Sequence, residues 1–363
     1  MTPAALAKLA GVAALLVLAL NAPSMMPNAY ILSAAVVILN YAVTATAWNV
    51  MGGLTGYISF GHAAYFGLGA YGTALLVGKA NVPSFLALGL AVVIVAVISA
   101  PIGFAALRVR GASFVITTIA LVLILLLVFQ SWSYPGGSNG LTVARPFPDL
   151  LRAEHHLRFY YLYLALLVVV MVCWWGIDRS RFGMGLKAIR EDEDKAESLG
   201  VPTIGYKLVA SVISAAFTGA SGGMYALWFG DLDPVFQFSI LVGAYMVLMS
   251  LLGGVRSLFG PLLGAIIVGF ALEYFKLEFG ESQFHLVATG LVLMLVVLFM
   301  PDGIIPAVAQ LYHRIFGGGE TSIREVTAEE LLEDHRSGAE QESEAPASSQ
   351  DPAGSNELTK VRQ

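Results

Sequence analysis

The side chains most able to do chemistry gather in one charged segment between apolar runs, residues 178–206. Its centre has the spacing of a helix, and Gly200 followed by Pro202 is a typical helix end. Two acidic residues stand three and four positions before Lys195, and either could form an ion pair with it along the helix. A charged helix of this kind is either a solvated loop or a surface that binds a water-soluble partner. The residues alone leave both interpretations open.

Few other residues could act chemically, because polar groups are rare in the apolar runs. His62 is either a packed, hydrogen-bonded side chain or part of a pathway through the membrane. Glu273 comes near the end of its run, so we expect its carboxylate to reach the membrane surface. His155 and His156 are adjacent in a loop without further His or Cys, which favours a solvated loop over a metal site. Cys173 is the single cysteine, so an internal disulfide is excluded.

These residues argue against several function classes. No nucleophile, base and orienting group can be assembled from them, so an enzyme is not expected. The sequence has no GxxxxGK[ST] phosphate loop, so ATP binding by this chain is not expected. We expect no cofactor, metal or nucleic acid to be bound by this chain. The scarcity of ionisable groups in the apolar runs argues against a carrier driven by protons or sodium.

Composition indicates the fold class that must position these groups. Of 363 residues, 57% are hydrophobic and 12% are charged, and the mean hydropathy is +0.75. Soluble domains carry about 25% charged residues. An all-α, polytopic membrane protein with about eight to ten transmembrane helices is therefore predicted, since a bilayer forces the backbone into helices.

Ten apolar runs are candidate spans. They cover residues 6–20, 31–51, 54–77, 85–107, 113–129, 159–177, 207–229, 238–252, 258–275 and 284–300. The first run could pass for a signal peptide, but the spans that follow favour a first transmembrane helix. Runs 6–20 and 238–252 are shorter than the roughly 17 residues of a simple span, so tilted or re-entrant forms stay open.

The distribution of Lys and Arg predicts the orientation. Alternate loops hold ten basic residues on one side and five on the other, and the positive-inside rule makes the richer side cytoplasmic. Segment 178–206 and both termini are then cytoplasmic. Loop 131–158 lies on the outer side, where it could dock an external protein.

Two regions are expected, a transmembrane domain over residues 1–316 and a tail over residues 317–363. From Glu320 onward the tail holds eleven Asp or Glu and four Lys or Arg. Such sequence buries too little apolar area to fold, so a disordered, acidic cytoplasmic tail is predicted. A regulatory segment or one that contacts a partner polypeptide is the alternative.

Small residues recur four positions apart in several runs, and small side chains let helix backbones approach closely in a bilayer. The clearest row is Ser211, Ala215, Gly219 and Gly223. Tight helix packing explains such rows, and a second interpretation is that two of these helices line a pathway. The candidate pathway residues are Ser59, His62, Ala63, Gly67, Ser214, Thr218 and Gly222.

Several motifs, in order, resemble one known family. The longest is SRFGMGLKAIREDEDKAESLGVPTIGYKLVASVISAAFTGASGGMYA, which begins at Ser180. It resembles the cytoplasmic loop and following helix of the branched-chain amino-acid ABC transporter permeases, the LivM-like group. Further matches are WNVMGGLTGYISFGHAAYFGLGAYGTALL, LRVRG, GGSNGL, LLGGVRSLFGPLLGA and FMPDGII. The resemblance covers nearly all of residues 30–306.

The resemblance implies a permease subunit of an ATP-driven importer in the bacterial inner membrane. It further implies a second, homologous LivH-like permease, two cytoplasmic ATPases that bind ATP and Mg, and an external substrate-binding protein. Branched-chain amino acids are the implied substrates, and urea or short-chain amides, which similar permeases serve, are the close alternative. A self-sufficient channel or secondary carrier is the alternative from another class, and transport by the purified chain alone would favour it.

The resemblance also places the ATPase contact in segment 178–206. The coupling motif of ABC permeases is Glu-Ala-Ala followed by Gly, and here Asp and Lys replace its first two residues. A second departure is that run 113–129 lacks an acidic residue that many members carry. The residues expected to couple are Ala188, Arg190, Glu191, Asp192, Asp194, Lys195, Ala196, Leu199 and Gly200. Either Ala196→Glu or Gly200→Pro is expected to abolish transport by a chain that still inserts.

Overall fold

The computed structural model describes residues 3–26 and 28–280, together with positions 287, 290, 291, 294, 303 and 304. Its elements are α1 (Pro3–Asn21), η1 (Ala22–Met25), α2 (Ala29–Thr55), α3 (His62–Gly78), α4 (Ser84–Ala106), α5 (Ala112–Ser131), η2 (Gly137–Asn139), β1 (Leu141–Thr142), α6 (Arg152–Arg179), α7 (Arg181–Glu191), α8 (Glu193–Ser198), α9 (Thr203–Phe229), β2 (Asp231–Leu232), α10 (Pro234–Gln237), α11 (Ile240–Gly253) and α12 (Gly260–Phe279). The predicted all-α class is confirmed. The predicted tail and most of run 284–300 lie outside the described residues.

Seven helical stretches among the described residues are long and apolar enough to cross a membrane. They are α2, α4, α5, α6, α9, α10 together with α11, and α12. Run 6–20 forms α1, of 19 residues, and α3 has 17 residues. The chain is thus a polytopic helical membrane protein, as its composition indicates.

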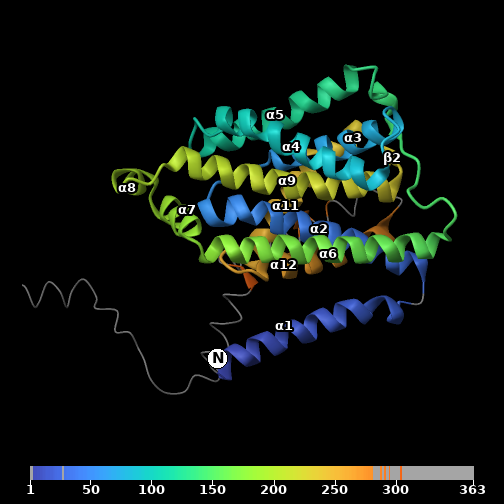
Figure 1. The fold of residues 1–363 in the computed structure, drawn as a ribbon, viewed down its shortest axis with the longest axis horizontal. Coiled ribbons are helices and arrows are strands. Elements are labelled where there is room, and N and C mark those ends of the chain that lie inside the picture. The colour runs from blue at the N-terminus through green and yellow to red at the C-terminus, as the bar shows by residue number, and fades with distance from the viewer. Residues whose placement is uncertain are drawn as a thin grey trace, which may run out of the picture. The chain divides into compact units, whose positions relative to one another are not determined.

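The helices α2 and α9 form the centre of the bundle (Figure 1). The apolar stretches of α2 and α9 are 56% and 61% buried, against 22% for both α4 and α5. Helices α4 and α5 expose Leu, Ile and Val side chains along their length, which suits a surface in contact with lipid. The buried polar side chains lie mainly on the two central helices.

The predicted single span over residues 54–77 is wrong. Helix α2 ends at Thr55, and Gly56 adopts a left-handed conformation with φ 77°, which glycine reaches without a steric penalty. Residues 56–61, here called the re-entrant segment, then turn back along α2, and α3 begins at His62. The indole Nε1 of Trp48 donates to the carbonyl of Ser59 at 2.8 Å, which holds the segment against α2.

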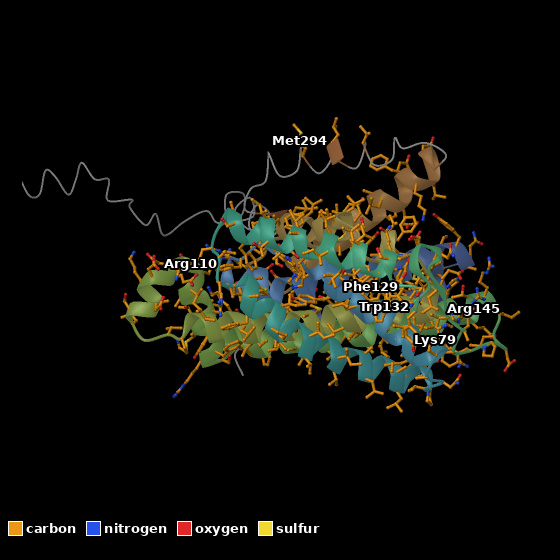
Figure 2. The ribbon with its side chains drawn as sticks, turned by 90° about the horizontal axis from the view of Figure 1, so that it is seen from above. Lys79, Arg110, Phe129, Trp132, Arg145 and Met294 are labelled. Atoms are coloured by element: carbon orange, nitrogen blue, oxygen red, sulfur yellow. The ribbon has the colours of Figure 1, made fainter. Side chains whose placement is uncertain are left out.

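The long helices connect two opposite ends of the bundle (Figure 1). Helices α7 and α8 lie at one end, called the α8 end. The loop of residues 132–151 lies at the other, called the loop end, where β1 pairs with β2 in antiparallel register. Arg110 lies at the α8 end, whereas Lys79 and Arg145 lie at the loop end (Figure 2). The predicted outer loop is shorter than expected, because α6 already begins at Arg152.

Small residues bring α3 and α9 into backbone contact, as the four-residue spacing predicts. A Cβ atom added at Gly69 would collide with the backbone of Gly219, and one at Gly222 would collide with the carbonyl of Phe66. The same packing joins α12 to α11, where a Cβ at Gly264 would meet the backbone of α11. These contacts hold the central helices at a separation that only glycine permits.

Candidate functional site

The charged segment folds into two short helices where one was expected. Ser180 caps α7 by accepting a hydrogen bond from the amide of Gly183 at 3.0 Å. Asp192 has an extended backbone that ends α7, and its carboxylate then caps α8 by accepting from the amide of Lys195 at 3.0 Å. The predicted ion pair of Asp192 with Lys195 is present at 3.0 Å. Gly200, with φ 87°, follows the end of α8, as predicted.

The nine expected coupling residues differ in exposure. Those that are exposed are Glu191, Asp194, Lys195, Leu199 and Gly200; those that are half-buried are Ala188, Arg190 and Asp192. Leu199 is 84% exposed, an unusual position for a large apolar side chain outside the membrane spans. Ala196 is only 2% exposed. Ala196→Glu would therefore disrupt the packing of α8 within this chain as well as any contact of α8 with a partner. Leu199 therefore gives the cleaner substitution.

Arg190 anchors α7 on the end of α2. Its guanidinium donates to the carbonyl of Gly53 at 2.5 Å, and its stem packs against Gly56. Burial, with a contribution from nearby Arg256, lowers the pKa of Arg190. The contact places α7 directly beside the re-entrant segment.

A cluster of four side chains connects α8 to the membrane helices. Lys207, at the start of α9, lies 2.6 Å from Glu193 of α8 and donates to the hydroxyl of Tyr57 at 3.1 Å. The Tyr57 hydroxyl donates a short hydrogen bond to Glu193, and the Lys207 ammonium lies 4.5 Å from the centre of the Tyr57 ring. Arg110, between α4 and α5, lies 3.3 Å from Glu193. We call Tyr57, Arg110, Glu193 and Lys207 the α8 cluster.

The central ion pair of the α8 cluster is largely removed from water. The side chain of Lys207 is 1% exposed and that of Glu193 is 11% exposed. Burial alone would raise the pKa of Glu193, but the hydrogen bonds from Lys207 and Tyr57 outweigh it and lower that pKa. Burial, followed by the bond to Glu193, raises the pKa of Tyr57. Glu193 is thus held as a carboxylate that joins α8 to the re-entrant segment and to α9.

Sequence reasoning missed this cluster. Lys207 counts in the sequence as one more basic residue of a loop, and Tyr57 is separated from it by 150 positions. One sequence signal could have indicated the cluster: Lys207 stands directly before an apolar run. A lysine there needs an acidic or polar partner if the start of the helix is buried.

All seven candidate pathway residues are buried. Gly222 meets Phe66 where α9 contacts α3, whereas Gly67 faces Phe238 and Ala63 lies beside Gly243 of α11. His62 Nε2 lies 2.6 Å from Ser214 Oγ, and Ser214 donates its own proton to the carbonyl of Ala47 at 2.5 Å. Ser214 must therefore accept from His62, so Nε2 carries the imidazole proton. Thr218 donates to the carbonyl of Ser214 at 2.9 Å. These seven residues pack neighbouring helices together, and none of them lines the cavity described next.

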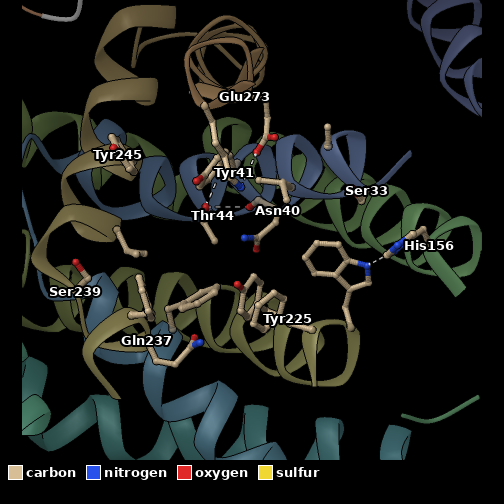
Figure 3. A pocket seen from close by; sticks show the side chains of 18 of the residues that line it. Ser33, Asn40, Tyr41, Thr44, His156, Tyr225, Gln237, Ser239, Tyr245 and Glu273 are labelled. Carbon is tan, nitrogen blue, oxygen red and sulfur yellow. Dashed lines mark hydrogen bonds and ion pairs between the residues drawn. The ribbon is translucent and has the colours of Figure 1, made fainter. Parts of the chain in front are cut away.

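A cavity of about 550 Å³ opens between α2, α9, α11 and α12 toward the loop end. In Figure 3 the α2 residues Asn40 and Thr44 lie on one side of it, and Gln237 and Tyr225 lie on the other. Its volume falls within the range of about 300–1,000 Å³ that is typical of small-molecule sites. Asn40 and Gln237 are polar residues that sequence reasoning missed, because each is a single polar residue beside an apolar run.

One sequence interpretation of residues at the loop end is wrong. His155 and His156 do not lie in a solvated loop: they belong to α6, and His155 is 3% exposed. His155 donates to the carbonyl of Trp228 at 3.1 Å, and His156 accepts from the Trp228 indole at 2.9 Å. The expectation that they bind no metal stays a prediction, although no cluster of three potential ligands occurs in the described part of the chain.

Glu273 makes a contact that sequence reasoning did not predict. Its carboxylate accepts from the hydroxyl of Tyr30 at 3.1 Å and lines the cavity, while its reach to the membrane surface stays a prediction. Lys276 lies 4.0 Å from Glu273. The opening of the cavity thus has an acidic group among basic ones.

Comparisons with known proteins agree on one family. The family model described as "Branched-chain amino acid transport system / permease component" matches residues 30–300. The LivM permease protein of Escherichia coli strain K12 is 28% identical over 319 residues, which covers 81% of this chain and 74% of that protein. The BraD permease protein of Pseudomonas aeruginosa is 25% identical over 284 residues, covering 73% and 91%. The LivH permease protein of Escherichia coli strain K12 is 23% identical over 282 residues, covering 73% and 91%. No solved structure matches the chain.

Proposed function

We propose that this chain, which belongs to the family of permease components of branched-chain amino acid transport systems, is the membrane subunit of an ATP-driven importer for those amino acids. The observation that carries the proposal is the exposure of α8 and its C-cap. Leu199 and several charged side chains are exposed there, while Glu193 binds α8 to the transmembrane helices. Relatives named as branched-chain amino acid permeases support the substrate class.

The proposed importer needs three kinds of partner. Its relatives include proteins named LivM and LivH, which supports pairing with a second, homologous permease. Two ATPases hold ATP and Mg and bind α7 and α8, since this chain carries no phosphate loop of its own. An external binding protein delivers substrate at the loop end. The α8 end and both termini face the cytoplasm of a bacterium, and the chain lies in its inner membrane.

The α8 cluster supplies the mechanical connection in this proposal. The nine coupling residues present α7 and α8 to an ATPase, and movement of the ATPase shifts α8 as a rigid body. Because Glu193 holds Lys207 of α9 and Tyr57 of the re-entrant segment, both must follow α8. The buried pathway residues of α3 and α9 then separate, which opens a path through the packed centre.

Purification in a mild detergent, with ATPase activity assayed in the eluate, tests this function. We expect the second permease and two ATPases to co-purify, and hydrolysis to rise when a leucine-loaded binding protein is added. Stimulation by a urea- or acetamide-loaded binding protein alone would assign the substrate to the amide class instead. A chain that purifies alone and transports solute without ATP would contradict the proposal.

A further inference from the structure

The cavity at the loop end contains two buried amide side chains with unused hydrogen-bonding capacity. Gln237 is 3% exposed, and its Oε1 has no hydrogen-bond partner among the described residues. Asn40 is 7% exposed. Its Oδ1 accepts from Ser221 at 2.6 Å, which leaves its Nδ2 hydrogens available to the cavity. A buried amide atom without a partner destabilises a protein, so the unpaired Oε1 of Gln237 and the available Nδ2 of Asn40, on opposite sides of one cavity, indicate a polar ligand.

Apolar side chains complete the inner part of the cavity. Phe66 and Met246 are 4% and 2% exposed, and they pack in one cluster with Val242. All three line the cavity. An aliphatic side chain placed against them would be removed from water, at a gain of about 25 cal/mol for each Å² of apolar surface.

The charged groups of the lining lie near the opening. Arg145, Arg152 and Lys276 are exposed, and they accompany Glu273 at the loop end. An excess of positive charge at an entrance attracts a carboxylate and disfavours a cationic ligand. The inner part, around the two amides, is uncharged, which suits a ligand whose own charges cancel.

We propose that this cavity, within a single permease chain, is a binding site for a zwitterionic amino acid with an aliphatic side chain. The Nδ2 of Asn40 donates to the ligand carboxylate, and the Oε1 of Gln237 accepts from the ligand ammonium. Phe66, Val242 and Met246 contact the aliphatic side chain. The proposal rests on the proposed function, which supplies the substrate class, and adds where this chain holds the substrate.

Cysteine labelling of the complete importer in proteoliposomes tests binding directly. Cys173 is the single native cysteine, so Cys173→Ser with Val242→Cys leaves one thiol in this chain, inside the cavity. Leucine at about ten times its half-protecting concentration should slow labelling by a thiosulfonate reagent about tenfold, because a single site is then about 90% occupied. L-lysine and L-leucinamide should protect far less. Cys173→Ser with Leu151→Cys, whose position is 73% exposed outside the cavity, should label at the same rate with and without leucine.

A transport measurement gives the second readout. Gln237→Met keeps the length of the side chain but removes both polar atoms, so uptake of leucine at low concentration should fall about tenfold or more, as expected for lost bonds to charged groups. Gln130→Met, the same change in α5 at a position that does not line the cavity, should leave leucine uptake unchanged.

One result would contradict the binding site alone, and another would contradict the proposed function. Normal leucine uptake by Gln237→Met, together with no protection of the Val242→Cys thiol, would remove the site and leave the importer function intact. Failure of the wild-type importer to take up leucine would contradict the proposed function, and the amino-acid site with it.

Discussion

At the scale of single residues, Lys207 is the least expected group in the molecule. Its side chain is 1% exposed, and an isolated ammonium in such a place would be costly. Glu193 and Tyr57 compensate by direct contact, from α8 and from the re-entrant segment. A charge pair of this kind adds little net stability compared with an apolar pair, but removing one partner leaves an unpaired charge.

Glu193→Gln should therefore be strongly destabilising. We expect the free energy of unfolding to fall by about 3–5 kcal/mol, because Lys207 loses its carboxylate while it stays buried. Thermal unfolding in detergent would measure the change. Glu197→Gln is the matched control, since Glu197 is 62% exposed and lies 3.6 Å from Arg110, and it should change stability by less than about 0.5 kcal/mol. If the two substitutions lowered the free energy of unfolding equally, Glu193 would not be the partner that stabilises buried Lys207.

The same pair predicts a pH dependence. The pKa of Glu193 is lower in the folded protein than its ordinary value, so the folded state binds the proton less tightly than the unfolded state. The stabilisation is therefore complete above the ordinary glutamate pKa of about 4.3 and is lost as the pH falls through the lowered value. The difference in melting temperature between wild type and Glu193→Gln should be constant from pH 8 to 5 and shrink below pH 4. A difference that grows on acidification would contradict this assignment.

At the scale of elements, the glycines between α3 and α9 determine how closely the two helices approach. Gly222→Val should destabilise the protein by about 1–3 kcal/mol or prevent its folding, because the added atoms collide with the backbone at Phe66. The yield and melting temperature of the purified protein would show this. Gly205→Val makes the same change in α9 where no atom of the described residues lies within 4 Å of the new Cβ, and it should behave as wild type. A wild-type yield and melting temperature for Gly222→Val would mean that α3 and α9 do not approach each other this closely.

Helix α8 predicts a second outcome at this scale. Leu199→Glu places a charge on the most exposed apolar side chain of the α8 end, so it should weaken co-purification of the ATPases about tenfold or more, as for the loss of a buried apolar anchor. Leu151→Glu makes the same change on a 73% exposed leucine at the loop end. It should retain the ATPases fully, and loss of ATPases in both variants would point to a general assembly defect instead.

Sequence patterns predicted most of the membrane spans correctly, but they did not predict where helices break or begin. Apolar length alone identifies α4, α5, α6 and α9, since a bilayer requires it. The break at Gly56 escaped prediction because run 54–77 is apolar on both sides of it. The start of α6 escaped because its first turns are polar, which left His155 and His156 in the expected loop.

The candidate site was predictable only in part. Segment 178–206 stands out by charge, and its end at Gly200 was predicted correctly. The α8 cluster needs contacts between residues as distant as Tyr57 and Lys207, which no local pattern reveals. The cavity depends on Asn40 and Gln237, and a lone amide in or beside an apolar run has no periodicity that would mark it.

At the scale of the whole molecule, the chain has two functional ends joined by one bundle. The α8 end offers a charged surface with one exposed leucine, and the loop end offers a basic opening to a small cavity. Between them, the close contact of α3 with α9 leaves no side chain of the seven candidate pathway residues exposed. A structure of this kind transports only if something moves the central helices, which is the role that we assign to the ATPases acting through α8.

Uptake of labelled leucine into proteoliposomes tests that claim most directly. The vesicles would contain this chain either alone or with its second permease and ATPases, with a leucine-loaded binding protein on one side and ATP present or absent on the other. We predict uptake only when all subunits and ATP are present. Uptake by this chain alone, or uptake by the complete importer without ATP, would contradict it.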